Sequence, residues 1–444
     1  MEMNIIHNSL LLLFIVLTFV LTFTNSHRDT AYYDDYMKKR AKDALEDSFK
    51  AYNPNPEELT DQFNGQVGEV LIHGNVTRRH LKEGDCKATN PIDRCWRCDP
   101  NWARNRKRLA DCAQGFGRHT TGGRDGLYYV VNNPSDDDMQ NPKPGTLRHA
   151  VIQDVPLWII FKHSMVIRLQ QELIFTSNKT IDGRGVEVHI AHGAGITLQF
   201  VKNIIIHNIK IHHIVPAPGG LIRDSADHFG LRARSDGDGI SVFGASNIWI
   251  DHVSLSKCTD GLIDAIMAST AITISNCKFN NHDDVMLLGA NDEHGRDVIM
   301  QTTVAFNRFG KGLIQRMPRC RWGFFHIVNN DYSQWQMYAI GGSSHPTIIS
   351  QGNRFRASNH PFTKQVTKRQ EAEESEWMKW QWRSEGDKFL NGAYFVESGP
   401  PIKHTIMYPL NLKHKNMMKF RPGSYAGRLT RYAGAINCKV GELC

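Results

Sequence analysis

The sequence lacks, after its first 26 residues, any hydrophobic run long enough to cross a membrane. Its one long apolar run, residues 10–23, is interrupted only by Thr and is shorter than the about 20 residues that a membrane helix needs. The small polar residues Thr24, Asn25 and Ser26 follow this run, and no Lys or Arg precedes it. The pattern predicts a signal peptide over residues 1–26 and a secreted chain with no membrane contact after cleavage; an uncleaved N-terminal anchor is the alternative.

The chain also lacks the composition of a disordered or collagen-like protein. Its 444 residues are 41% hydrophobic and 22% charged, so the chain can bury a sizeable core. It has no acidic excess, because 53 Lys and Arg residues stand against 45 Asp and Glu residues, a formal net charge of +8. A basic balance favours an anionic partner, and composition alone leaves nucleic acid, acidic lipid and acidic polysaccharide open.

Nine cysteines suit a secreted chain, because disulfides persist in an oxidising compartment. Nine is an odd number, so one thiol can stay free. The C-x-x-C motif at residues 95–98 has no second copy, which favours structural bridging over a zinc or redox site. Spacing suggests three pairs: Cys95 with Cys112, Cys258 with Cys277, and Cys438 with Cys444.

Two sequons match the acceptor pattern for N-linked glycans. They begin at Asn75 and Asn178, each followed two residues later by Thr. Because the chain is expected to be secreted, both are predicted glycosylation sites.

From about residue 156 onward, short runs rich in Val, Ile and Phe recur between Gly, Asn and Asp turns, which is typical of strands. An Asn recurs in four of them, at Asn276, Asn307, Asn330 and Asn353, in steps of 31, 23 and 23 residues. Such steps match one coil of a solenoid, and long helical patterns are nearly absent between the runs. The sequence therefore predicts an all-β parallel β-helix in which the Asn side chains hydrogen-bond from coil to coil. The expected strand runs are 158–161, 203–214, 248–255, 271–279, 303–309, 324–332 and 347–355.

The two flanks differ from this repeat. Residues 27–115 are charged, contain Pro54 and Pro56, and then become Cys-rich, which predicts a flexible leader followed by a cap on the first coil. After about residue 357 the strand pattern fades, and residues 370–382 predict a short helix or wrapping arm whose Trp residues cover the core rather than bind sugar. We divide the chain into a signal peptide (1–26), a leader and cap (27–115), a β-helix domain (116–410) and a C-terminal arm with a disulfide (411–444).

Carboxylates cluster in three segments of neighbouring coils, which are residues 235–239, 260–264 and 282–284. If the coils stack, these carboxylates meet on one ridge. Hard oxygen ligands without Cys or His at zinc spacing suit Ca²⁺, and incomplete protein ligation would leave room for a substrate carboxylate. A single Asp-Gly pair is more often a simple turn, but three segments in adjacent coils favour a metal site.

A basic segment follows, with Arg316, Arg319 and Arg321 around a proline. Guanidinium groups bind carboxylates with two parallel hydrogen bonds, so this cluster suits a polyanionic chain. A solvated basic turn is the alternative.

Several of these stretches resemble one known family. The motifs are Trp-Ile-Ile-Phe at 158–161, Thr-Ile-Asp-Gly-Arg-Gly at 180–185, Ser-Asp-Gly-Asp-Gly-Ile at 235–240, Ile-Trp-Ile-Asp-His at 248–252 and R-x-P-x-x-R at 316–321. Together they resemble the pectate lyases of polysaccharide lyase family 1, and residues 90–100 resemble the plant, pollen-type branch. The resemblance implies a right-handed parallel β-helix and Ca²⁺-dependent β-elimination of de-esterified homogalacturonan in the plant cell wall. It also implies a monomer with an acidic polysaccharide, not nucleic acid, as its partner.

The resemblance also implies roles for individual residues. Asp238, Asp260 and Asp264 match the primary calcium ligands, and Asp236 matches a ligand of an additional, substrate-linked ion. Arg316 matches the catalytic arginine, and Arg321 matches an arginine that binds substrate. Asp284 stands where the microbial pattern has a substrate-binding Lys, which replaces a cation by an anion facing a polyanion.

Two other functions compete with the lyase. A polygalacturonase would share the β-helix but hydrolyse with paired carboxylates, for which Asp283 and Asp284 offer one pair. A non-catalytic wall protein could bind pectate through Ca²⁺ without turnover, an alternative that the Asp284 replacement keeps open. Four histidines in strand patterns, His189, His207, His212 and His213, have no carboxylate at metal spacing and are expected to be buried or edge residues.

Overall fold

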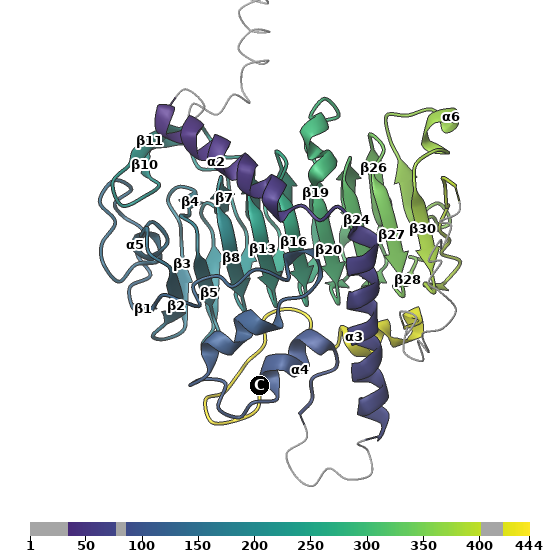
Figure 1. The fold of residues 1–444 in the computed structure, drawn as a ribbon, viewed down its shortest axis with the longest axis horizontal. Helices are drawn as coiled ribbons and strands as arrows, with labels where there is room; N and C mark the ends of the chain where they lie inside the picture. Colours follow the sequence, from purple (N-terminus) through teal and green to yellow (C-terminus); the bar gives the residue numbers. More distant parts are fainter. Residues whose placement is uncertain (1–33, 77–85, 401–420) are drawn as a thin grey trace, which may run out of the picture.

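The computed structural model describes residues 34–76, 86–400 and 421–444 (Figure 1). The predicted signal peptide lies outside the described residues, and so does the expected boundary near residue 410. Among the described residues, no helix is both long enough and apolar enough to span a membrane.

Three parallel sheets, which we call A, B and C, wind around one core and form a parallel β-helix, as predicted (Figure 1). Each coil contributes about one strand to each sheet, and adjacent coils pair in parallel register. Sheet A contains β1 (Leu127–Val131), β2 (Leu157–Phe161), β5 (Lys179–Asp182), β8 (Lys202–His207), β13 (Ser246–Asp251), β16 (Thr270–Ser275), β20 (Gln301–Ala305), β24 (Phe324–Val328), β27 (Thr347–Gln351) and β30 (Trp382–Glu385). Sheet B contains β3 (Met165–Ile167), β6 (Val188–Ala191), β9 (Lys210–His212), β14 (Ser254–Ser256), β17 (Lys278–Asn280), β21 (Arg308–Phe309), β25 (Asp331–Ser333), β28 (Arg354–Arg356) and β31 (Lys388–Leu390). Sheet C contains β4 (Leu173–Ile174), β7 (Ile196–Gln199), β12 (Ile240–Phe243), β15 (Ile263–Ile266), β19 (Met286–Leu288), β23 (Arg319–Arg321), β26 (Ile340–Ser343) and β29 (Thr367–Arg369).

Two smaller strand pairs and several short helices project from these coils. The pairs are the antiparallel hairpin β10 (Gly220–Arg223) and β11 (Phe229–Arg232), and the parallel pair β18 (His282–Asp284) and β22 (Leu313–Gln315). The short helices are α5 (Leu147–Val151), η5 (Gly295–Ile299) and α6 (Glu374–Trp377). The expected arm at 370–382 thus includes the four-residue helix α6, and Trp380 and Trp382 are buried in the core, as predicted.

The interior repeats from coil to coil because parallel register places equivalent side chains above one another. A column of aromatic rings runs through sheet B with centroid spacings of 4.5 to 5.7 Å, and it consists of Phe279, Phe309, Tyr332, Phe355 and Phe389. A column of amides lies beside it. Asn307 Nδ2 donates to Asn330 Oδ1 (3.0 Å), and Asn330 Nδ2 donates to Asn353 Oδ1 (3.0 Å).

The predicted asparagine ladder is correct for these three residues and wrong for Asn276. Cys277, not Asn276, aligns with Asn307, and its backbone N–H donates to Asn307 Oδ1. Asn276 lies in the turn one residue earlier, with a positive φ of 51°, and its side chain bonds Asp251.

The expected flexible leader is wrong over residues 35–76, which form two helices, α2 (Asp35–Ala51) and α3 (Pro56–Val76). The Asp34 side chain caps α2, and the helix buries Met37 and Ala44. Residues 52–55 are the break between the helices, because proline suits a first helical turn and disfavours helix in the residue before it. Figure 1 shows α2 running across several coils, where Arg40 Nη2 donates to the carbonyls of Phe175 and Gln199.

The Cys-rich cap consists of α4 (Pro91–Arg97), η3 (Arg106–Cys112) and η4 (Gly115–Gly117), and it covers the outer face of sheet A. The C-terminal residues η6 (Gly423–Tyr425), α7 (Ala426–Leu429) and the segment to Cys444 pack beside the cap (Figure 1). Trp96, Trp102, Trp158 and Trp249 are fully buried between cap and sheet, so this interface is a second hydrophobic core.

The disulfides confirm two of the three expected pairs. Cys95 pairs with Cys112 and Cys438 with Cys444, while Cys98 pairs with Cys86, so the C-x-x-C motif is structural. The expected Cys258–Cys277 bridge is wrong. Ser254 pairs with Lys278 in adjacent strands, so Cys277 lies level with Val253. Cys258 is five residues further along the chain than Val253, which corresponds to about 16 Å of strand. A disulfide needs Cα atoms within about 7 Å, so these two cysteines cannot pair. Three thiols stay free, at Cys258, Cys277 and Cys320.

Candidate active site

The predicted acidic segments lie where the chain enters sheet C: residues 235–239 precede β12, residues 260–264 run into β15, and residues 282–284 form β18 just before β19. Register aligns Ile240, Ile263 and Met286, so the residues two positions earlier, Asp238, Gly261 and Asp284, occupy equivalent places in successive coils. A Cβ atom at position 261 would lie 2.2 Å from Asp264 Oδ1, so any residue other than Gly261 would have to displace that carboxylate. The carboxylates therefore gather along one edge of sheet C, as the sequence predicts.

The carboxylates affect one another's ionisation. Burial raises the pKa of Asp238, and the charges of Asp260 and Asp236 raise it further. Burial and the charges of Asp238 and Asp260 likewise hold the pKa of Asp264 well above its usual range, while Arg316 opposes this shift. Asp238, Asp260, Asp264 and Arg316 are therefore near enough to influence one another and border a common space, but among the described residues the three carboxylates do not bring one oxygen each within 4.8 Å of the other two.

The donor atoms of this set are of the type that a hard divalent cation binds, and the side chains would have to move closer together to ligate one ion. The Oδ1 atom of Asp238 is buried without a hydrogen-bond partner, while its Oδ2 atom accepts from the Ser241 hydroxyl at 2.8 Å. Asp264 Oδ1 accepts a hydrogen bond from the backbone N–H of Leu287 at 3.2 Å. These carboxylate oxygens are recessed, accept few hydrogen bonds and have raised pKa values, so a bound cation would stabilise their ionised form. Ca²⁺ suits them because it takes oxygen ligands in a flexible geometry. Asp236 is exposed at the rim of this space.

Arg316 lies between β22 and β23 with a positive φ of 59°, a backbone conformation that a residue other than glycine adopts at a cost. Its Nε lies 3.1 Å from Asp284 Oδ1, and both side chains are about a quarter exposed. Burial raises the pKa of Asp284 and the neighbouring guanidinium lowers it. Arg316, the expected catalytic arginine, thus forms an ion pair with Asp284, the residue that replaces the family Lys.

The other two arginines are also paired with acids. Arg321 Nε donates to Asp292 Oδ1 at 2.6 Å, and its Nη1 donates to the Gly289 carbonyl at 2.8 Å. Arg319 Nη2 donates to Glu371 Oε1 at 3.1 Å. Arg321 is mostly buried, so its guanidinium is fixed in orientation rather than mobile.

Sequence reasoning missed Tyr338 and His282, which border this space, and Asp292, which pairs with Arg321. Burial raises the pKa of Tyr338 to about 12, and its ring lies among Arg319, Arg316 and Asp284. His282 has a lowered pKa because it is recessed, and its Nε2 atom has no hydrogen-bond partner. The register of the coils would have been needed to find them, because Tyr338 belongs to a later coil than Arg316.

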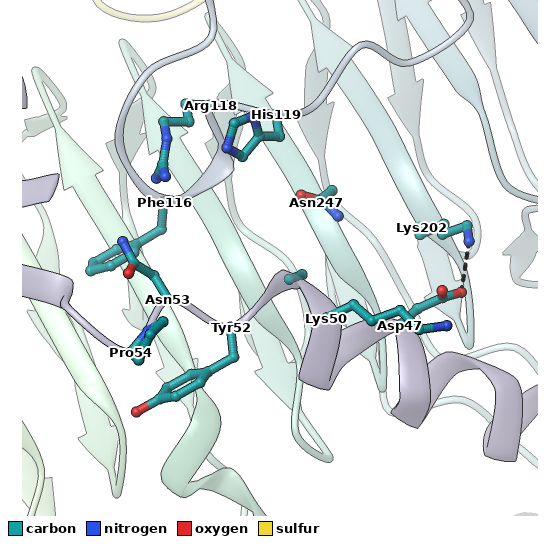
Figure 2. Close-up of a pocket in the computed structure, with 11 residues that line it drawn as sticks. Asp47, Lys50, Tyr52, Asn53, Pro54, Phe116, Arg118, His119, Lys202 and Asn247 are labelled. Carbon is teal, nitrogen blue, oxygen red and sulfur yellow. Dashed lines mark ion pairs between the residues drawn. The ribbon is translucent and has the colours of Figure 1, made fainter.

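A cavity of about 380 Å³ lies elsewhere, between the end of α2, the η4 turn and sheet A. Figure 2 shows its lining, in which Lys202 pairs with Asp47 at 2.9 Å and Arg118 and His119 approach from the η4 turn. None of the predicted site residues lines it, so its volume does not mark the predicted site.

The whole chain was also compared with protein families, curated proteins and solved structures. A protein-family model described as "Pectate lyase" matches residues 167–376, and one described as "Pectate lyase, N terminus" matches residues 30–81. The chain is 60% identical to "Pectate lyase" of Lilium longiflorum, over 94% of this chain and 96% of that protein. It is 54% identical to "Probable pectate lyase 7" of Arabidopsis thaliana, over 93% and 94% of the two chains. Among solved structures, jun a 1, the major allergen from cedar pollen, superposes with a TM-score of 0.73 at 46% identity, over 78% of this chain and 99% of that one.

Proposed function

The chain belongs to the pectate lyase family and is a lyase, and from this premise we propose a calcium-dependent β-elimination of de-esterified homogalacturonan. Asp238, Asp260 and Asp264 would hold the ion, with Asp236 available to a second ion that binds together with substrate. The observation that carries this proposal is the common space shared by these carboxylates and Arg316 at one edge of sheet C.

The reaction removes a proton from C5 of a galacturonate unit and expels the 4-O-linked sugar, so that a C4–C5 double bond forms. When bound, Ca²⁺ supplies positive charge to the C6 carboxylate as negative charge develops there. We assign Arg316 the C5 proton, because it is the guanidinium that faces the carboxylate cluster. Arg321 would orient a substrate carboxylate, because Asp292 and the Gly289 carbonyl already fix its plane.

Asp284 adds a constraint to this scheme. Its carboxylate stabilises the charge on Arg316, whereas proton abstraction needs the guanidinium to act as a base. Substrate entry would therefore have to break or weaken the Arg316–Asp284 pair. The product is an unsaturated oligogalacturonate, which distinguishes elimination from the hydrolysis that a polygalacturonase would perform.

The deciding experiment uses purified full-length protein with polygalacturonate, with and without a calcium chelator. We expect ultraviolet absorbance from the conjugated product, loss of that absorbance with chelator, and recovery with added Ca²⁺. Reducing ends that form without ultraviolet absorbance would contradict elimination, and activity that resists chelator would contradict the calcium role and favour a pectin lyase.

Arg316→Ala tests the role of the guanidinium. We expect turnover to fall by about a thousandfold or more while binding of polygalacturonate changes little, because the group acts in the transition state. Arg308→Ala is the matched control, because Arg308 is exposed on sheet B and should leave turnover unchanged. A wild-type protein that binds polygalacturonate with Ca²⁺ but never turns it over would support the non-catalytic wall protein instead.

Secretion to the plant cell wall and a monomeric state complete the proposal. Asn178 is half-buried in the turn before β5, and its Oδ1 atom accepts from Asn203 while a glycan would attach to its Nδ2 atom. Asn75 lies in the last turn of α3, and its side chain is outside the described residues. Both remain predicted glycosylation sites, and mass shifts on deglycosylation would test them.

A further inference from the structure

Four histidines form a cluster at the end of sheet B. His189 and His212 belong to the adjacent strands β6 and β9, and His192 and His213 are the residues that directly follow these strands. The next coil has Lys257 at the position equivalent to His213, so the cluster belongs to two coils. We propose that His192, His212 and His213 bind one late first-row transition-metal ion, for which Zn²⁺ is the probe.

The spacing of ring nitrogens supports three-point ligation. One nitrogen from each of His192, His212 and His213 lies within 4.8 Å of the other two. Three nitrogens at about 2.1 Å from a tetrahedral Zn²⁺ lie about 3.4 Å apart, so small side-chain rotations suffice. Among the described residues, this trio is the group of His, Cys, Asp and Glu side chains that meets such spacing.

The backbone directs the two outer rings to the same side. His192 and His213 both have positive φ values, 61° and 53°, and the His192 N–H donates to the His213 carbonyl at 3.1 Å. Because the two turns are equivalent in successive coils, the rings stack with centroids 5.1 Å apart. Two exposed ligands are thus held in register by the β-helix itself.

A chain of contacts orients the third ring. His189 Nε2 lies 3.2 Å from Glu187 Oε1, and His189 Nδ1 lies 2.8 Å from His212 Nε2. If His189 donates from Nε2 to the carboxylate, it accepts from His212 Nε2–H. The remaining lone pair of His212 is then on Nδ1, which lies 2.9 Å from His213 Nδ1. A carboxylate that orients a metal-binding imidazole through its second nitrogen is a common outer-shell arrangement.

The chemistry of this donor set selects the class of ion. Imidazole nitrogens bind Zn²⁺, Ni²⁺ and Cu²⁺, whereas Ca²⁺ takes oxygen ligands. Water would complete the coordination, because His192 and His213 are exposed. The bound ion would bridge two coils and stabilise their stacking.

The test uses full-length protein without a polyhistidine tag, in excess Ca²⁺ so that the carboxylate site does not compete for the probe. We expect calorimetry to show one Zn²⁺ bound per chain. His192→Asn and His213→Asn should each weaken binding at least tenfold, because Asn tolerates the positive φ but removes an imidazole. His163→Asn is the matched control, an exposed histidine outside the cluster that should leave Zn²⁺ affinity unchanged.

Two further measurements separate a metal site from a structural cluster. Zn²⁺ should raise the thermal midpoint of the wild-type protein and not that of the His192→Asn, His213→Asn double variant. With Cu²⁺ as probe, electron paramagnetic resonance should show nitrogen ligands that the double variant loses. No binding by the wild-type protein at about 100 μM Zn²⁺, or equal binding by the double variant, would overturn the proposal.

Discussion

In the proposed site, the negatively charged carboxylate of Asp284 faces a negatively charged substrate. Asp284 therefore has two effects: its charge repels the substrate, and its ion pair with Arg316 engages the guanidinium that would otherwise face the substrate. For Asp284→Asn we expect KM for polygalacturonate to fall about fivefold, because a charge about 6 Å away in a wet cleft contributes roughly 1 kcal/mol. Initial rates over a range of polygalacturonate concentrations measure this change.

The neighbouring Asp283 supplies a control for that prediction. Asp283→Asn removes the same charge one residue away, where its partner is Gln315 Nε2 at 3.1 Å, and leaves the Arg316–Asp284 pair intact. An equal fall in KM in both variants would show that only the electric field matters. A rise in KM for Asp284→Asn would contradict the placement of Arg316 against substrate.

Asp264 tests the calcium site through stability rather than activity. Without a bound cation, Asp264 experiences burial and the charges of Asp238 and Asp260, which destabilise its ionised form. Asp264→Asn should therefore raise the thermal midpoint in chelator, while the rise that millimolar Ca²⁺ gives the wild-type protein should vanish. Thermal unfolding by circular dichroism measures both, with the exposed Asp137→Asn as control. A calcium response that persists in Asp264→Asn would exclude this residue as a ligand.

At the scale of elements, the amide ladder joins successive coils at buried positions. Asn330 Oδ1 accepts from both the backbone N–H and the Nδ2 of Asn307, and its own Nδ2 donates to the Val304 carbonyl. Asn330→Ala would leave buried donors unsatisfied, at a cost of about 2–3 kcal/mol in unfolding free energy. Denaturant unfolding measures the loss, and the exposed Asn141→Ala should change stability by less than about 0.5 kcal/mol. A neutral Asn330→Ala would mean that water replaces the lost amide.

The sequence predicted sheets A and B well and sheet C poorly. The expected run 158–161 covers a strand of sheet A alone, and each later run, such as 248–255, covers a strand of sheet A, the turn after it and at least the start of a strand of sheet B. The strands of sheet C have two to four residues and include polar members such as Asp264, Arg319 and Arg321, so their hydrophobic pattern is too short to detect. The predicted site residues lie beside that sheet. The sequence grouped these residues through the order of their motifs. Their spacing alone could not predict the strand register that brings Asp284 next to Arg316.

At the scale of the whole molecule, long-range contacts explain what sequence reasoning missed in the flanks. The helix α2 becomes ordered by contacts with coils more than a hundred residues away, such as the bonds from Arg40 to Phe175 and Gln199. The cap and C-terminal segment are joined in the same way, since Arg97 Nη2 donates to the Cys444 carbonyl and Trp102 Nε1 to the Glu442 carbonyl. Local composition described these segments as charged, but it could not predict which surface they cover.

The caps over sheet A also enclose histidines whose ionisation affects the stability of the whole molecule. Burial lowers the pKa values of His207 and His326 to about 4. Both rings are fully buried, His207 against Asp251 and His326 against Gln351. In the unfolded chain a histidine has a pKa near 6.5, so between pH 6.5 and 4 the unfolded state binds more protons than the folded state. Stability from these histidines is therefore present above pH about 6.5 and is lost as the pH falls toward 4.

Replacing one of these histidines isolates its share of that loss. His326→Gln keeps a donor for the Gln351 Oε1 atom, now 3.0 Å from His326 Nε2, but removes the titrating ring. We expect the difference in unfolding free energy between pH 6.5 and pH 4 to shrink by up to about 3 kcal/mol, the equivalent of a pKa difference of about 2.5. Denaturant unfolding at both pH values measures this difference. Carboxyl groups with raised pKa values make the protein more stable as the pH falls, which opposes the effect of the histidines. The pH dependence of the variant is therefore compared with that of the wild-type protein. The exposed His163→Gln should keep the wild-type dependence, and an unchanged dependence in His326→Gln would mean that the buried ring accepts a proton without cost to the fold.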